Sequence, residues 1–222
     1  MNFPLLWRLV LAHVAADFPL QPDALIRAKR RGWGIPLHAA IFGVAAAMTL
    51  GEFAGKRIVI YSLVALTLYH GLVDWGKMEL QKKLGRDSVW LFLGDQALHL
   101  ASLAAVAFVF RLYRVAPAPA YLPLTLAIVA VWAVPIFVEL VREELAKPGK
   151  FSRRPLGDRI SKLGMVECTF LFGGTFQGGW FYLAFLILIP RLVLVLNGKK
   201  VGPQPVNWML AVALGFTARL TF

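Results

Sequence analysis

Long apolar segments make up most of the 222-residue chain, and short segments rich in Lys, Arg, Gly and Pro separate them. A helix that spans a bilayer needs about 20 mostly apolar residues. The pattern therefore predicts an all-α, polytopic transmembrane helix bundle of about seven or eight helices. The predicted helices are residues 4–20, 36–54, 58–77, 88–111, 120–143, 159–175, 179–197 and 206–222. The sixth and eighth are short, and the pattern leaves open whether they span fully.

Composition supports a membrane protein. Hydrophobic residues are 59% of the chain and charged residues 16%, whereas about a quarter of a typical soluble domain is charged. The net charge of +12 does not indicate nucleic-acid binding, because most of the Lys and Arg lie in the short connections between apolar segments. We expect one integral membrane domain, with a four-helix core in residues 1–112 and accessory transmembrane helices in residues 120–222.

The basic connections alternate along the chain. Those after the first, third, fifth and seventh helices are rich in Lys and Arg, whereas the connections between them carry only Lys56, Arg57, Arg111 and Arg114. Basic connections stay on the cytoplasmic side of a membrane. We therefore expect the first set to face the cytoplasm and both termini to face outward.

Polar residues recur inside the first four predicted helices. The four histidines fall one in each helix, and three have an aspartate four residues away: His13 with Asp17, His70 with Asp74, and His99 with Asp95. Residues four apart lie on one helix face, one turn along. Neighbouring helices run antiparallel. The six residues of these pairs and His38 therefore fall at one level, roughly 5–15 Å below the cytoplasmic surface.

Packing alone is a poor explanation for this cluster. An interhelical hydrogen bond in a membrane contributes about 1 kcal/mol, whereas burying an ionisable group there costs a few kcal/mol. Imidazole and carboxylate groups bind zinc, iron or manganese. We expect one or two divalent ions, most readily zinc, with ligands from His13, His38, His70, Asp74, Asp95 and His99. A metal-free His–Asp proton relay is the main alternative.

Other polar residues are expected to assist this site. We expect the metal ligands to be oriented by hydrogen bonds from Asp17, Gln21, Gln96 and Lys77. Lys77 could instead contact a lipid phosphate. Asp17, Asp74 and Glu167 are candidates for a general base. The basic stretch at 147–159 is expected to set topology or to gather an anionic substrate at the cytoplasmic surface.

The motifs resemble a known family. His13-x3-Asp17-Phe18-x2-Gln21, a lone His38, His70-x3-Asp74-x2-Lys77 and Asp95-Gln96-x2-His99 are similar to a bacterial membrane-protein family called domain of unknown function 3307. The resemblance covers roughly residues 5–105 and implies a multi-pass protein of the bacterial inner membrane. A looser similarity links the pattern to predicted membrane-bound metal-dependent hydrolases.

Three functions are compatible with these features. The first is a metal-dependent hydrolase acting on a lipid-linked or phosphorylated substrate near the cytoplasmic face, with membrane lipids as its surroundings. The second is a cation or proton transporter that uses the same His–Asp cluster. The third is a non-catalytic membrane subunit. Metal content of the purified protein would discriminate among them, whereas the sequence leaves the substrate and the oligomeric state open.

Overall fold

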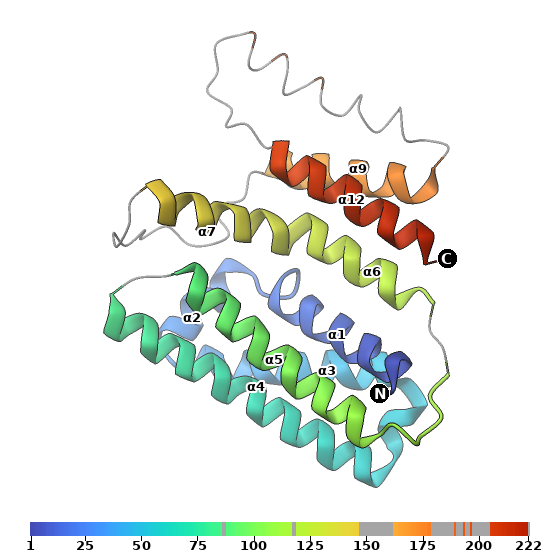
Figure 1. Cartoon of the computed structure of the whole chain (residues 1–222). Coiled ribbons are helices and arrows are strands. Elements are labelled where there is room, and N and C mark those ends of the chain that lie inside the picture. The colour runs from blue at the N-terminus through green and yellow to red at the C-terminus, as the bar shows by residue number, and fades with distance from the viewer. Residues whose placement is uncertain are drawn as a thin grey trace.

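The computed structural model describes residues 1–85, 88–116, 119–146, 162–178 and 205–221, and single residues 189, 193 and 196. All regular secondary structure in this part of the chain is helical, which confirms the all-α class (Figure 1). The helices are α1 (Phe3–Asp17), α2 (Asp23–Arg30), α3 (Gly34–Leu50), η1 (Gly51–Gly55), α4 (Arg57–Leu84), α5 (Val89–Val109), α6 (Tyr121–Ile128), η2 (Val129–Ala133), α7 (Val134–Ala146), α9 (Lys162–Gln177) and α12 (Pro205–Leu220).

Helices α1, α3, α4 and α5 form a closed ring. Contacts join α1 to α3, α3 to α4, α4 to α5, and α5 back to α1. The N-terminus lies beside the end of α5, where the Asn2 amide donates to the carbonyl of Ala107 at 3.1 Å (Figure 1). Consecutive ring members run in opposite directions. The end of α1, the start of α3, the far end of α4 and the start of α5 therefore share one end of the bundle.

Two elements at that end differ from the sequence prediction. Helix α4 continues to Leu84, seven residues beyond its predicted end at residue 77, so Lys77, Lys82 and Lys83 lie on the helix rather than in a connection. The segment after α1 is not simply a loop, because residues 23–30 form the short helix α2. The predicted helix at 179–197 lies outside the described residues, apart from three single positions.

Four helical segments of the described chain are long and apolar enough to cross a membrane: Gly34–Gly55, Arg57–Leu84, Val89–Val109 and Tyr121–Leu145. Helix α1 has 15 residues and is shorter than a spanning helix, but it is embedded in the ring, with Leu5, Leu9, Ala12 and Ala16 at most 1% exposed. Large apolar side chains on the outside of the bundle, such as Val44, Leu68 and Leu98, are at least half exposed, as expected for a lipid-facing surface.

Small residues allow α3 and α4 to approach closely. A Cβ added at Gly43 would lie 2.7 Å from Oγ1 of Thr67, and one added at Gly71 would lie 3.2 Å from Cβ of Ala39. Below the polar cluster, towards the N-terminal end of α1, the ring is filled by a buried apolar core that includes Leu9, Phe42 and Leu103. The histidines of α3 and α4 are thus brought together by tight backbone packing.

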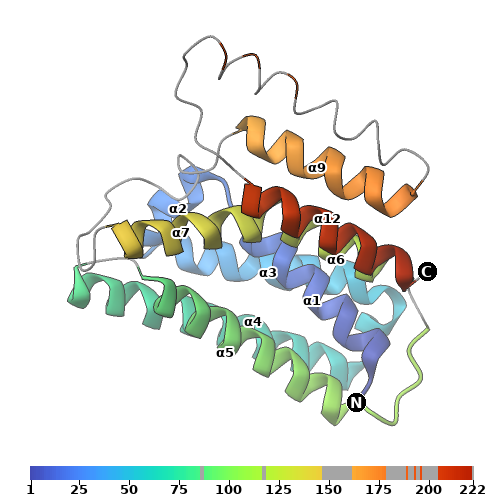
Figure 2. The ribbon, with the colours of Figure 1, turned by 45° about the horizontal axis from the view of Figure 1, so that its top comes forward.

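The described helices of the second half of the chain pack on one side of the ring. The continuous segment α6–η2–α7 contacts α1 and α5, whereas α9 and α12 pack against each other and against α6 (Figure 2). Buried residues such as Ile136 and Leu140 join this segment to Leu11 and Val14 of α1. The π-turn at Val129–Ala133 ends two residues before Pro135, and the missing N–H of a proline is readily accommodated beside such a widened turn.

Candidate metal centre

All four histidines meet in the middle of the ring. His13, His38, His70 and His99 are each at most 2% exposed. The rings of His70 and His99 lie 4.2 Å apart between centroids, those of His38 and His70 5.0 Å, and those of His13 and His99 4.9 Å. This arrangement agrees with the prediction from the sequence, in which one histidine from each of the first four helices lies at a common level.

Four atoms from three helices surround a single point. Nε2 of His38 lies 3.1 Å from Nε2 of His70, 3.2 Å from Oδ1 of Asp17 and 3.4 Å from Oδ2 of Asp74. Nε2 of His70 lies 3.4 Å from the same Asp17 oxygen and 3.8 Å from the same Asp74 oxygen. In a tetrahedral zinc site with bonds of about 2.0–2.1 Å, neighbouring ligand atoms are about 3.3 Å apart. Five of the six edges of this tetrahedron thus have separations close to those of a metal site.

Hydrogen bonds alone cannot satisfy these four atoms as well as a bound cation would. A neutral imidazole nitrogen carries at most one hydrogen, yet Nε2 of His38 has three polar atoms within 3.4 Å. Oδ2 of Asp74 is buried and makes no hydrogen bond with any described residue. A cation placed among the four atoms would be contacted by all of their lone pairs at once.

Asp17 lies at the centre of the cluster rather than at its edge. Its side chain is 8% exposed, and Oδ1 is 3.2–3.7 Å from nitrogens of His13, His38 and His70. Asp17 also forms a group with Asp95 and His99 in which one ligand atom of each residue lies within 4.8 Å of the others. The sequence suggests a supporting or basic role for Asp17, and the geometry adds a place among the candidate ligands.

Two lysines hold the outer carboxylates. Nζ of Lys29 lies 2.9 Å from Oδ1 of Asp74, and Nζ of Lys77 lies 2.8 Å from Oδ2 of Asp95. Lys29 is only 8% exposed although it belongs to a strongly basic segment. The sequence analysis did not single it out. The available signal was the spacing of Leu25, Ala28 and Lys29, which share the buried face of α2.

Two glutamines connect these groups. Gln96 donates from Nε2 to Oδ2 of Asp17 at 3.3 Å and of Asp95 at 3.2 Å, and its Oε1 lies 3.2 Å from Nε2 of His13. Gln21 donates to the backbone carbonyl of Asp17 at 3.1 Å and accepts from Lys29 at 3.3 Å. Both residues therefore contact the ends of the cluster, and a supporting role for them stays a prediction.

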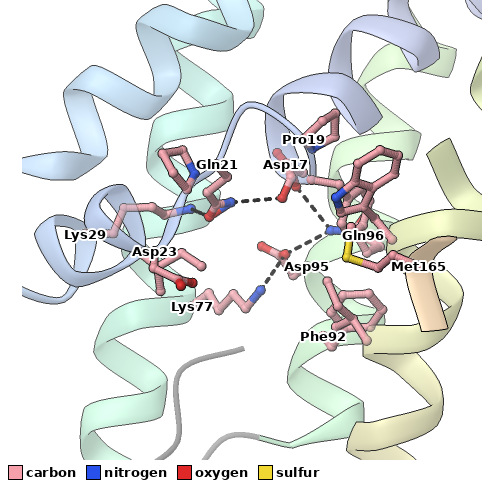
Figure 3. Close-up of a pocket in the computed structure, with 15 residues that line it drawn as sticks. Asp17, Pro19, Gln21, Asp23, Lys29, Lys77, Phe92, Asp95, Gln96 and Met165 are labelled. Carbon is pink, nitrogen blue, oxygen red and sulfur yellow. Dashed lines mark hydrogen bonds and ion pairs between the residues drawn. The ribbon is translucent and has the colours of Figure 1, made fainter. Parts of the chain in front are cut away.

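A pocket of ≈ 340 Å³ opens beside the carboxylates (Figure 3). Its polar wall comes from the first half of the chain and includes Asp17, Lys29, Lys77, Asp95 and Gln96. Its other wall is apolar and includes side chains from the second half of the chain, namely Trp132, Ile136 and Met165. The sequence analysis did not identify these three residues, because nothing in a single apolar segment shows which face packs near a site.

Glu167 lies away from the cluster. It is fully buried in α9, where Oε2 accepts a hydrogen bond from Nε1 of Trp208 in α12 at 3.0 Å. It is not among the residues that line the pocket, although Met165, two residues earlier, is. The described structure therefore does not bring Glu167 together with the other predicted site residues.

Phe42 closes the cluster on the side opposite the pocket. Its ring stacks on His70, with centroids 4.5 Å apart and planes 9° from parallel, and it is 1% exposed. Phe42 is also part of the apolar core that fills the rest of the ring. The cluster therefore has a polar opening on one side and packed hydrocarbon on the other.

These features define an all-helical protein with helices long and apolar enough to cross a membrane, built around a buried His–Asp cluster. The chain belongs to the family described as protein of unknown function (DUF3307), which residues 5–131 match. The family predicted from the motifs is thus confirmed, and the match extends beyond them into α6 and η2. No curated protein and no solved structure matches the chain.

Proposed function

We propose that this protein is a membrane-embedded, metal-dependent hydrolase of the bacterial cytoplasmic membrane that acts on a lipid-linked or phosphorylated substrate. The observation that carries the proposal is the tetrahedral arrangement of Asp17, His38, His70 and Asp74 around one point beside a pocket. Zinc suits this mixed nitrogen and oxygen set best, and iron or manganese would also be bound by it.

The pocket supports an amphiphilic substrate with an anionic group. Lys29 and Lys77 place two ammonium groups on the wall beside the cluster, and an ammonium group binds phosphate well. Trp132, Ile136 and Met165 form an apolar surface opposite, against which an acyl or isoprenoid chain would pack. Basic residues such as Arg27, Arg30 and Lys83 lie at this end of the bundle, which favours its placement at the cytoplasmic face.

In the proposed hydrolysis, the ion and the side chains of the protein have separate roles. A divalent ion supplies Lewis-acid chemistry, because it polarises a phosphoryl or ester oxygen and lowers the pKa of a water ligand towards about 7. The side chains of Lys29 and Lys77 would hold the anionic group.

Transport is less well supported. A conducted ion needs a route to the far side of the membrane, whereas Phe42 and the apolar core behind it fill the ring beyond the cluster. The cluster also lies in a ring of continuous helices, without the broken helices that commonly form transporter sites at mid-membrane. Within the described ring, the site is therefore open from one side.

The test is metal content together with hydrolysis. Protein purified in mild detergent would be assayed for metal and for release of phosphate or alcohol from a panel of phospholipids and isoprenoid phosphates. We expect tightly bound metal and turnover in the wild type, and loss of turnover with less bound metal in His70→Ala and Asp74→Asn. Lys82→Ala, on the same helix but exposed, serves as the matched control and should retain both.

Two results would overturn the proposal. One is folded wild-type protein that binds no divalent ion with useful affinity. The other is metal-loaded protein that hydrolyses nothing in the panel but carries cations into proteoliposomes, with the flux lost in His70→Ala. The second result would establish the transporter alternative.

A further inference from the structure

We infer that the cluster is a two-ion centre in which the carboxylate of Asp17 bridges the ions. The inference rests on the proposed metal site and extends it with a second ion held by Asp17, Asp95 and His99. One ligand atom of each of these three residues lies within 4.8 Å of the others. The first ion would be held by Asp17, His38, His70 and Asp74.

The strongest observation is a pair of unsatisfied buried atoms on α5. Oδ1 of Asp95 and Nε2 of His99 lie 3.5 Å apart, and neither makes a hydrogen bond with any described residue. Asp95 is 5% exposed and His99 1% exposed. Buried polar atoms are nearly always paired, so two such atoms facing each other indicate a missing partner that both would contact. A cation is that partner, because each atom offers it a lone pair.

Asp17 has the geometry of a bridge. Oδ1 faces the nitrogens of His38 and His70, whereas Oδ2 faces the other way and accepts a hydrogen bond from Gln96 on α5. The two oxygens of this carboxylate thus have different neighbours, and Asp17 is the residue that the two candidate ligand groups share. In two-metal sites the ions are typically about 3.5–4 Å apart, a separation that a carboxylate spans.

The support around the two groups is also duplicated. Lys29 holds the outer oxygen of Asp74, and Lys77 holds the outer oxygen of Asp95, each at 2.8–2.9 Å. In both carboxylates the oxygen that faces the cluster is the unsatisfied one. Each outer carboxylate is therefore oriented in the same way, with one oxygen fixed by an ammonium group and the other directed at the candidate ion position.

The two positions differ in coordination. The first is surrounded by four side-chain atoms, which is the pattern of a closed site, whereas the second has three, which leaves a position open. Asp17 and Asp95 both line the pocket, which places this group beside the space that a substrate would occupy (Figure 3). His13 lies beside both positions: its Nε2 is 3.2 Å from Oε1 of Gln96, its buried Nδ1 is 3.7 Å from Oδ1 of Asp17, and it forms a further candidate ligand group with His70 and His99.

The net charge of the site favours two ions over one for binding an anionic substrate. With neutral histidines, Asp17, Asp74 and Asp95 with Lys29 and Lys77 carry a net charge of −1. Two divalent ions make the centre strongly cationic, whereas one leaves it at +1. A phosphate dianion with a hydroxide is matched by the two-ion centre. The inference therefore assigns the substrate class as a phosphate monoester bound across both ions.

The experiment is metal counting on the full chain in mild detergent, with Mn²⁺ as the probe. We expect two Mn²⁺ per chain and a spin-coupled electron paramagnetic resonance spectrum in the wild type. Asp95→Asn and His99→Gln should bind one, with an uncoupled six-line spectrum, and retain a wild-type circular dichroism spectrum. Lys82→Ala, exposed on α4, is the matched control and should keep two.

One ion per wild-type chain at saturating Mn²⁺, or two ions in a folded His99→Gln variant, would overturn the inference. These failures are distinct from failure of the proposed function. Hydrolysis by a one-ion protein would leave the hydrolase standing without the bridge. Two coupled ions without hydrolysis of any phosphate ester would support the two-ion centre and contradict the hydrolase. Protein that binds no ion would contradict both proposals.

Discussion

Nζ of Lys29 lies 2.9 Å from Oδ1 of Asp74, which joins the short helix α2 to the middle of α4. The ammonium comes from outside the ring of α1, α3, α4 and α5, and it is buried with its partner. Breaking a buried ion pair by removing one partner is costly, because the other charge stays buried without compensation. This contact therefore fixes the position of α2 and the orientation of a candidate metal ligand together.

Replacing Lys29 tests this dual role. Lys29→Met should lower the free energy of unfolding by about 3–5 kcal/mol and weaken metal binding about 10–100-fold. The exposed pair of Lys82 with Glu79, whose side chains are 56% and 38% exposed, provides the control. Lys82→Ala should change stability by less than about 1 kcal/mol. Denaturant unfolding in detergent measures both, and equal effects of the two substitutions would contradict the interpretation.

The approach of α2 to α3 depends on Gly34. A Cβ at this position would lie 2.4 Å from the backbone nitrogen of Lys29, so Gly34→Ala must displace α2 and with it the Lys29 ammonium. We expect loss of stability and weaker metal binding. Gly76→Ala in α4 is the matched control, because a Cβ there meets nothing within 4 Å. Since alanine favours a helix over glycine by about 1 kcal/mol, that variant should be unchanged or stabilised. A Gly34→Ala protein with unaltered metal affinity would contradict the placement of α2.

Removal of metal should destabilise the folded chain in a pH-dependent way. Ions that bind the native state alone stabilise it by about 2.7 kcal/mol when their free concentration is 100-fold above Kd. Protons compete for the same imidazole and carboxylate atoms, so this stabilisation should be present near about pH 8 and lost towards about pH 5. A chelator should lower the Tm of the wild type at the higher pH by more than it lowers the Tm of His38→Ala. An equal response of the two proteins to chelation would exclude His38 as a ligand.

Orientation is open to cysteine labelling. Cys168 is the only cysteine and is buried, so a Cys168→Ala background accepts single cysteines elsewhere. Arg27 and Lys83 lie exposed at the α2 end of the bundle, whereas Glu52 and Arg114 lie exposed at the other end. An impermeant maleimide applied to intact cells should label Glu52→Cys and Arg114→Cys but not Arg27→Cys or Lys83→Cys. Inverted vesicles should give the opposite pattern, and labelling of Lys83→Cys from outside would reverse the topology.

The convergence of the histidines could be predicted because it depends on local and regular geometry. Spacing four puts imidazole and carboxylate on one helix face, and antiparallel neighbours bring His13, His70 and His99 to a shared level. The family and the all-helical class followed from the same motifs and from the apolar segments. That these side chains bind metal stays a prediction, tested by the measurements proposed above.

The parts that sequence alone could not supply depend on tertiary contacts. Lys29 lies in a segment whose charge predicts only a solvated connection, and its burial requires the docking of α2 against Gly34. Helix α4 ends at Leu84 rather than near residue 77, because Lys77, Lys82 and Lys83 do not end the helix although they end its apolar segment. A helix continues beyond an apolar segment where long basic side chains reach water or a buried carboxylate. The packing of Glu167 against Trp208 likewise depends on how α9 meets α12.

Helix α4 has a mechanical consequence beyond its length. It runs without interruption from Arg57 to Leu84, so ten further residues extend past Asp74 in one stiff rod. His70 and Asp74 belong to this rod, and neither can shift along its axis independently of the outer end. A force or a binding partner that tilts the tip near Leu84 would change the spacing of His70 and Asp74 relative to Asp17 and His38. A tilt of α4 at its C-terminal end would therefore move the candidate ligands His70 and Asp74 as well.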